Sequence, residues 1–278
     1  MRLIKPSVEI IKQEEYDLNH SFKFIELAGR TCYKSEDKIT EDSAKKFVDR
    51  MIKSGHGAML EHGTVYLTIP NKNVSRSLLI YYCERNPYSK VVWTDTNVYI
   101  TTNYRAIIEN NWNDLLKYIT APTEFHVKRT TVKFICDRGI SHEFVRHRVF
   151  SFAQESTRYC NYTKDKFNNE LTFIIPCWIK DLKEGNYYAY CEYNHSKNDT
   201  SKRWFDSCMS SEFVYTNLIE EGWKPQEART ILPNSLKTEL IMTGFDSDWR
   251  HFFELRCATN AHPQAKELAD MLKDKFNK

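Results

Sequence analysis

The sequence predicts an α+β fold, in which helices pack around a small, mainly antiparallel sheet. Segments with helical periodicity outnumber those with strand periodicity, and the two kinds do not alternate as they do in a doubly wound parallel sheet. The chain has 278 residues, of which 41% are hydrophobic and 14% aromatic. It can therefore bury a sizeable core, and its length favours one domain spanning residues 1–278.

The first predicted elements are a helix and a half-buried strand. Thr40 and the acidic residues after it are typical of a helix start, and an apolar stripe then runs to Gly55, which predicts a helix over residues 41–54. Residues 63–69 alternate apolar and polar side chains and stop at Pro70, as a strand with one buried face does.

The middle of the chain mixes strand and helix signals. Residues 91–93 and 98–101 are predicted to pair as short strands, and residues 104–119 to be helical. Residues 130–136 are rich in β-forming side chains, and the turn signal after them predicts a strand followed by a helix over residues 141–148.

The last third is predicted to be mainly helical. A short strand is expected at residues 171–175, and helical signals run from about 187 to 221 with a polar interruption at 194–201. Three further helices are predicted to begin at Pro225, at Asp246 or Ser247, and at Pro263.

Charge and cysteine content exclude several classes of protein. The 40 Lys and Arg nearly balance 37 Asp and Glu, and a net charge of +3 is too small for a nucleic-acid coat or an anionic membrane surface. The eight cysteines never form Cys-x-x-Cys, so neither a zinc ribbon nor a disulfide framework is indicated. No signal peptide or stretch of about 18 apolar residues is seen, and we expect a cytoplasmic protein.

Common catalytic motifs are absent or fail on their spacing. His142 and His147 resemble a His-Glu-x-x-His zinc motif, but a separation of five residues turns them about 140° apart around a helix. We therefore expect no bound metal. The sequence also lacks a glycine-rich dinucleotide loop, a Walker loop and a Gly-x-Ser-x-Gly elbow.

One segment concentrates hydrogen-bond donors. Residues 146–158 hold three arginines, one histidine and three Ser or Thr residues, with few acidic partners. Arginine offers paired donors to phosphate, hydroxyl groups add short contacts, and nearby aromatic rings can stack on a flat ligand. A phosphate site, a solvated basic loop and a platform for single-stranded nucleic acid all fit these residues.

Arg146-His147-Arg148, then seven residues, then Ser156 resembles the signature of the flavin-dependent thymidylate synthases. Three other segments resemble this family in the same order, namely Glu61-His62-Gly63-Thr64, Ala228 to Pro233, and Phe253 to Cys257 followed by His262-Pro263-Gln264. The resemblance runs from about Gly55 to the end of the chain. Residues 71–125 look like a family-variable insertion.

The resemblance implies an enzyme that converts dUMP to dTMP. Methylenetetrahydrofolate would donate the carbon, and FAD reduced by NADPH would supply the hydride, without an enzyme nucleophile. It also implies a homotetramer with active sites between subunits, and we expect no nucleic-acid or membrane partner. The alternative is a protein that binds nucleotides or single-stranded nucleic acid through residues 146–159.

The resemblance also assigns roles to individual residues. Arg256 would be catalytic, because a permanently charged guanidinium beside the uracil favours an enolate-like base. The residues implied to bind dUMP are Glu143, Arg146, Gln154, Glu155, Ser156, Thr157, Arg158 and Arg229. The residues implied to bind FAD are His62, Thr64, Arg146, His147, Arg148, Gln154, Phe245, Ser247 and His251. The last three stand where other members have asparagine and arginine.

Overall fold

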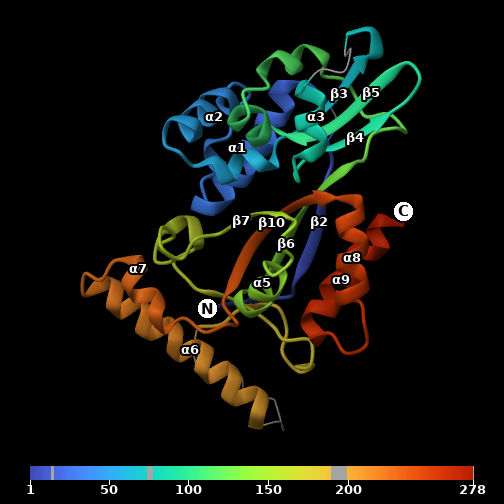
Figure 1. Cartoon of the computed structure of the whole chain (residues 1–278). Coiled ribbons are helices and arrows are strands. Elements are labelled where there is room, and N and C mark those ends of the chain that lie inside the picture. The colour runs from blue at the N-terminus through green and yellow to red at the C-terminus, as the bar shows by residue number, and fades with distance from the viewer. Residues whose placement is uncertain (14–15, 74–77, 189–198, 278) are drawn as a thin grey trace.

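The computed structural model describes residues 1–13, 16–73, 78–188 and 199–277. It confirms the α+β architecture, since helices surround small sheets that are mainly antiparallel (Figure 1). The central sheet has the strand order β2-β6-β10-β7, with every neighbouring pair antiparallel. Its strands are β2 (Ser7–Ile11), β6 (Arg129–Asp137), β7 (Ser151–Gln154) and β10 (Lys237–Phe245). The helices packed on it are α1 (Leu18–Tyr33), α5 (Arg138–Phe144), α8 (Asp246–Arg256) and α9 (Pro263–Phe276).

Alternation along β10 gives the central sheet two different faces. Leu240 and Met242 point into a core shared with α5, α8 and α9. Ile241, between them, packs against α1 on the opposite face. Since successive side chains of a strand point to opposite faces, the polar side chains of Glu239 and Thr243 lie on the α1 face as well.

A second sheet, in the order β3-β5-β4, lies above the central one in Figure 1 and has its own apolar core. The predicted helix over 41–54 and the predicted strand over 63–69 are confirmed, as is the antiparallel pairing of 91–93 with 98–101. The elements of this part are α2 (Ser43–Lys53), β3 (Thr64–Pro70), α3 (Leu78–Arg85), β4 (Lys90–Trp93), β5 (Asn97–Asn103) and α4 (Tyr104–Glu109).

The helix predicted over residues 104–119 is interrupted. α4 ends at Glu109, and Asn111 adopts a left-handed backbone conformation with φ 59°. Asparagine tolerates this conformation better than most residues, so the chain turns there. It resumes as a 3₁₀ helix over Asn113–Tyr118.

A third sheet, in the order β8-β1-β9, lies at the other end of the molecule beside α6. The short strand predicted at 171–175 is confirmed. Of the interruption predicted at 194–201, residues 194–198 lie outside the described residues, and 199–201 are helical. The elements here are β1 (Arg2–Ile4), β8 (Thr172–Ile174), β9 (Gly185–Asn186), α6 (Asp199–Glu220) and α7 (Pro225–Ala228). None of the helices described is both long and apolar enough to cross a membrane.

The helix predicted over residues 141–148 begins and ends earlier. Asp137 is its N-cap, because the Asp137 Oδ1 atom accepts a hydrogen bond from the backbone N–H of Ile140 at 2.7 Å. The segment read as a turn is therefore the start of α5, which ends at Phe144. As a result, Arg146 and Arg148 lie in the turns after the helix instead of within it.

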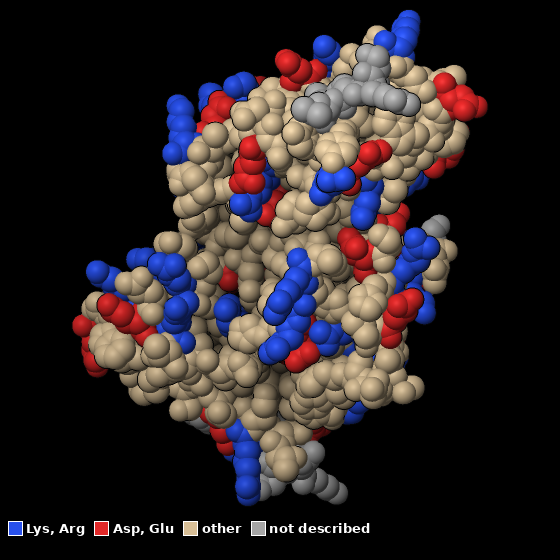
Figure 2. Space-filling view, viewed as in Figure 1, with Lys and Arg blue, Asp and Glu red and all other residues tan. Residues whose placement is uncertain are grey.

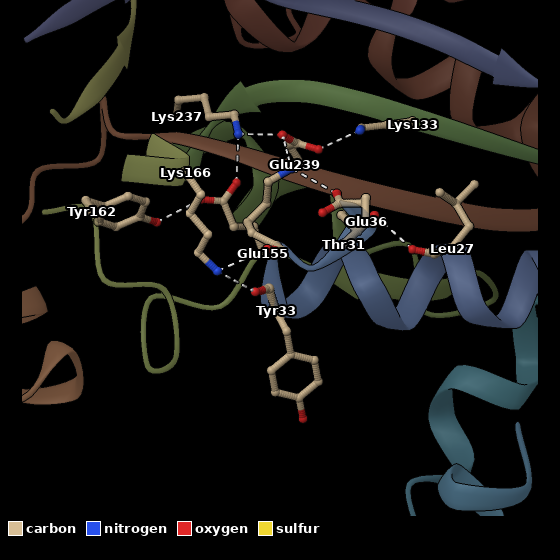
Figure 3. Close-up of polar contacts among 11 residues, drawn as sticks. Leu27, Thr31, Tyr33, Glu36, Lys133, Glu155, Tyr162, Lys166, Lys237 and Glu239 are labelled. Atoms are coloured by element: carbon tan, nitrogen blue, oxygen red, sulfur yellow. Dashed lines mark hydrogen bonds and ion pairs between the residues drawn. The ribbon is translucent and has the colours of Figure 1, made fainter. Parts of the chain in front are cut away.

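A network of buried ion pairs lies on the α1 face of the central sheet (Figure 3). Glu239 of β10 forms ion pairs with Lys237 at 2.6 Å, Lys34 at 2.9 Å and Lys133 at 2.6 Å. Lys237 also contacts Glu155 at 2.8 Å. Burial opposes ionisation of Glu239, but the three lysines outweigh it and hold its pKa well below the usual range. The network joins α1, β6, β10 and the segment after β7.

His62 joins the upper part to the central sheet. Its Nδ1 atom lies 2.9 Å from the hydroxyl of Thr243, whose Oγ1 atom lies 2.9 Å from that of Thr131 on β6. The His62 side chain is fully buried. Burial, and after it the nearby Arg129 guanidinium, lowers the pKa of His62 to about 3. The imidazole is therefore neutral in the native protein at neutral pH.

Replacing Lys237 with Met should destabilise the protein strongly. The substitution leaves the Glu155 carboxylate, whose side chain is 1% exposed, without its cation. Removing one partner of a buried ion pair typically costs about 3–5 kcal/mol, and urea unfolding would measure the loss. Lys45→Met is the control, because the Lys45–Asp49 pair is 71% and 49% exposed and should be worth about 1 kcal/mol or less. Equal losses in the two variants would contradict this account of the network.

The stability of the protein should fall as the pH is lowered, partly because of His62. Between about pH 6.5 and 3 the unfolded chain binds a proton at this histidine that the native protein does not. The free energy of unfolding therefore decreases by up to about 1.4 kcal/mol per pH unit for this group. Urea unfolding at stepped pH should give a shallower dependence for His62→Gln than for the unmodified protein. Parallel pH curves would show that His62 is not held neutral.

Candidate active site

Arg256, the last residue of α8, is clamped to the end of α5. Its Nε atom donates to His147 Nε2 at 2.9 Å, and its Nη1 atom donates to Glu143 Oε2 at 2.8 Å. The Nη2 atom donates to the backbone carbonyl of Glu143 at 2.7 Å, in the last turn of α5. The Arg256 side chain is 15% exposed and that of Glu143 is 42% exposed, so the clamp remains open to a ligand.

His147 is buried beside this clamp. Burial, followed by the positive charges of Arg256 and His251, lowers the pKa of His147 to about 4. The imidazole is thus neutral near pH 7. Because Arg256 can only donate, His147 Nε2 must accept, and the ring proton is assigned to Nδ1. In the segment Arg146 to Arg148, the neutral His147 ring therefore orients Arg256, and the arginines on either side of His147 are exposed.

A cavity of about 290 Å³ opens beside Glu143. Its wall includes Asp137, Asn234, His262 and Trp178. The indole of Trp178 is 56% exposed and lies edge-on to the His262 ring at 6.0 Å between centroids. Glu143 links this cavity to the Arg256 clamp, so one ligand can contact both.

A second cavity, of about 270 Å³, surrounds Phe245 at the end of β10. The guanidinium of Arg129 and the ammonium of Lys90 each lie 5.5 Å from the centre of the Phe245 ring, within the range of cation–π attraction. Arg148 and Ser151 also line the cavity. It is therefore a basic pocket with an aromatic wall.

Arg129 connects the wall of this cavity to Glu61 and Thr64, although no motif in the sequence indicates it. Its Nη1 atom donates to the carbonyl of Glu61 at 3.1 Å and to Thr64 Oγ1 at 3.2 Å. Burial lowers the pKa of Arg129 to about 10, which leaves the group charged at neutral pH. Only the strand register, in which Arg129 pairs with Phe245, identifies it as part of the site. That register pairs residues that are 116 positions apart in the chain, and no local sequence pattern indicates such a pairing.

The other residues implied to bind FAD fall into two groups. His62 and Thr64 lie behind the cavity, where Thr64 accepts from Arg129 and His62 contacts Thr243. Ser247 and His251 are exposed on α8 and do not line the cavity. The His251 ring lies 3.4 Å from the carboxylate of Glu254.

Some residues implied to bind dUMP are already engaged by protein groups. The Gln154 amide donates to Ser141 Oγ at 2.8 Å and to Thr238 Oγ1 at 3.2 Å. Both Glu155 carboxylate oxygens are engaged, one by the Tyr162 hydroxyl at 2.9 Å and the other by Lys237. The Glu155 side chain therefore fixes the segment that follows β7.

The rest of that segment presents polar groups to the surface. Ser156 is half-buried, and its Oγ atom accepts from the backbone N–H of Arg158 at 3.3 Å. Arg158 is exposed, and its guanidinium lies 5.4 Å from the Tyr159 ring centre. Exposed Arg229 approaches the buried Thr157 hydroxyl at 3.4 Å. The segment is thus tethered at Glu155 and open from Ser156 onward.

The described cysteines are poor nucleophiles in this structure. Burial raises the pKa of every one of them, to about 11 for Cys257 and about 12 for Cys160. A thiol with a raised pKa is rarely in its reactive thiolate form near pH 7. Within the described part of the chain, no group of three or more His, Cys, Asp or Glu side chains is placed to hold a metal. The cysteines that the structure describes are Cys32, Cys83, Cys136, Cys160, Cys177, Cys208 and Cys257.

Comparison with known proteins places this chain in a family. The model of the thymidylate synthase complementing protein family (Thy1) matches residues 15–83 and 108–278. A flavin-dependent thymidylate synthase of Pyrococcus furiosus is 29% identical over 202 residues, which are 70% of this chain and 75% of that protein. One of Corynebacterium glutamicum is 22% identical over 281 residues, covering 96% of this chain and 83% of that protein.

Among solved structures, the chain is similar to a UMP/dUMP methylase, PolB from Streptomyces cacaoi, bound with 5-Br dUMP. The TM-score is 0.45 at 17% identity, over 99% of this chain and 92% of that one, a likeness too weak to support a conclusion. The family model, in contrast, matches well over half of the chain. The chain therefore belongs to the Thy1 family, the flavin-dependent thymidylate synthases.

Proposed function

We propose that this protein converts dUMP to dTMP, with methylenetetrahydrofolate as the carbon donor and FAD, reduced by NADPH, as the hydride source. As a member of this family, the chain is a methyltransferase. The observation that carries the proposal is the Arg256 clamp, which joins the most specific sequence signature, at His147, to Glu143 and to a cavity of about 290 Å³.

Arg256 is the catalytic residue in this proposal. Its charge stabilises the negative charge that develops on the uracil ring, and the neutral His147 ring holds the guanidinium in one orientation because His147 Nε2 accepts the Nε–H of Arg256. The carboxylate of Glu143 neutralises Arg256 until a ligand arrives, and then accepts hydrogen bonds from the bound nucleotide. Because His147 and Glu143 both bind the guanidinium of Arg256, it is oriented before the reaction, and little free energy is spent on orienting it during the reaction.

The segment after β7 binds the phosphate of dUMP. Ser156 and Arg158 provide a hydroxyl and a guanidinium that are open to solvent, and Arg229 lies beside Thr157. Arg146 is a further exposed arginine that would contact the nucleotide. Gln154 and Glu155 act from behind, since their side chains are bound to Ser141, Thr238, Tyr162 and Lys237. Substrate binding therefore depends on the buried ion pairs that anchor this segment.

The residues around Phe245 fit a flavin dinucleotide. The cavity combines an aromatic ring with Arg129, Arg148 and Lys90, and a flavin dinucleotide combines a flat ring system with two phosphates. Thr64 accepts a hydrogen bond from Arg129 behind the cavity, His62 lies near Arg129 as a neutral ring, and Ser247 and His251 are exposed on α8. When bound, the flavin would supply the hydride, which no side chain can provide.

The chain's own thiols do not need to act as nucleophiles in this reaction. The raised pKa of each described cysteine accords with a methylation that depends on orientation and electrostatics. We further propose that the active protein is a homotetramer with active sites between its subunits. Activity should then be lost when the tetramer is diluted or dissociated.

The purified protein should bind FAD and respond to dUMP. We expect a yellow protein whose flavin absorption changes when dUMP is added, and which forms dTMP from dUMP when methylenetetrahydrofolate and NADPH are supplied. Chromatography of the nucleotides would detect the product. A colourless protein that ignores both ligands would contradict the proposed function.

Replacing Arg256 with Ala should lower turnover by roughly 10²–10³-fold, the usual effect of removing a preorganised electrostatic group. Flavin absorption should be retained. Arg250→Ala is the matched control, because Arg250 is an exposed arginine on the same helix, and its turnover should stay within a few-fold of the unmodified protein. Arg256→Lys should not restore the rate, since an ammonium cannot reproduce the two-ended clamp. Near-normal turnover of the Arg256→Ala protein would refute the catalytic assignment.

A further inference from the structure

The β4–β5 hairpin contributes to the Phe245 cavity although it lies outside the part of the chain that the family model matches. The matched segments end at residue 83 and resume at residue 108, so residues 84–107 fall between them. This stretch supplies Tyr88, Lys90 and Asn103 to the cavity wall. The opposite wall comes from β6, β10 and the segment after α5.

The hairpin side of the cavity is a firmly held structure. β4 pairs with β5 in a fixed antiparallel register that sets Lys90 opposite Thr101. Ser89, which is 4% exposed, donates a hydrogen bond of 2.8 Å to the buried Thr102 hydroxyl. Asn103 accepts from the backbone N–H of Ala106 and caps α4. The backbone at Lys90 is therefore fixed, and its exposed side chain extends over the Phe245 ring.

The cavity wall carries more positive than negative charge, although Glu61 and Asp248 stabilise the charge of Arg129 electrostatically. Lys90, Arg129 and Arg148 line it, with Asp248 as its one acidic residue. Across residues 1–13, 16–73, 78–188 and 199–277, no carboxylate lies within ion-pair distance of these three cations. One oxygen of Asp248 accepts the backbone N–H of Phe245 at 3.0 Å. Lys34, Lys133 and Lys237 on the α1 face, in contrast, are each paired with a glutamate.

Figure 2 shows Lys and Arg side chains above and below the middle of this face of the molecule, with Asp and Glu side chains among them. An excess of cations in a concave, partly aromatic pocket favours an anionic ligand that carries a flat ring. Dinucleotides with a diphosphate group have this chemistry, and both FAD and NADPH belong to this class.

We propose that the β4–β5 hairpin completes the FAD site of this protein, with Lys90 as a ligand of the diphosphate and Tyr88 as an aromatic wall. The inference rests on the proposed function, because it takes the bound dinucleotide to be FAD. It assigns a role to residues 84–107 that the family comparison leaves open. Lys90 and Arg129 then act as a pair of cations, one contributed by each part of the molecule.

The test compares Lys90→Gln with the matched control Arg85→Gln. Arg85 is an exposed cation at the end of α3, where it stacks on Tyr81 at 4.1 Å, and it is not part of the cavity wall. Dissociation constants for FAD, riboflavin and NADPH would be measured by titration calorimetry on the full chain. Circular dichroism and thermal unfolding would establish that both variants fold.

Lys90→Gln should weaken FAD binding about tenfold, the order expected for one hydrogen bond to a charged group. Binding of riboflavin, which has no phosphate, should not change, and Lys90→Arg should retain normal FAD affinity. The affinity of the Lys90→Gln protein for FAD should also depend less on salt concentration. Arg85→Gln should bind FAD like the unmodified protein.

Three outcomes would overturn the assignment. Equal FAD affinity of the Lys90→Gln and unmodified proteins would show that the hairpin does not contact the diphosphate. A loss confined to NADPH would mean that the hairpin binds the other dinucleotide. An equal loss for riboflavin and FAD would exclude a phosphate contact. If the unmodified protein bound no FAD at all, the proposed function would fail first, and the two failures are thus distinguishable.

Discussion

Strand β10 faces an apolar core on one side and a network of buried ion pairs on the other, and the rest of the structure depends on the separation of these two faces. Leu240 and Met242 pack into the core beneath α5, α8 and α9. On the opposite face, Glu239 is bound by three lysines, and Thr243 contacts His62. A shift of one residue in strand register would place the charged side chains in the apolar core and the apolar side chains among the lysines, so this register is strongly determined. The clamp and the cavities are positioned around this strand.

The strand also explains why the active-site segment follows β7. β7 is an edge strand that pairs only with β10 among the described strands, with Gln154 opposite Leu240. Immediately after the last pair, Glu155 enters the buried ion-pair network and holds the chain there. The polar residues from Ser156 onward are then released to the surface from a fixed point. The fold thus separates the buried ion pairs that fix this segment from the exposed side chains that are available to contact a ligand.

Local patterns in the sequence predicted the features that local patterns control. The strand over 63–69 and the pairing of 91–93 with 98–101 follow from alternation and turn signals, and the structure confirms them. The turn signal after residue 136 is in fact the start of α5, because residues that favour turns also cap helices, as Asp137 does, and only the fold shows which role applies. Arg129 could not be recognised at all, since its role depends on pairing with Phe245 across the sheet. The contact of Arg256 with Glu143 is likewise a product of tertiary structure, although the resemblance to a known family indicated both residues.

The upper part of the molecule and the central sheet are bridged by a hydrogen bond that lies wholly in the interior. His62 meets Thr243 where water cannot replace either partner, so pulling the upper part away would leave polar groups unsatisfied. The position of the β4–β5 hairpin relative to β10 therefore depends in part on this interior contact. Ligand contacts in the cavity around Phe245 then depend on a hydrogen bond that lies outside the cavity wall.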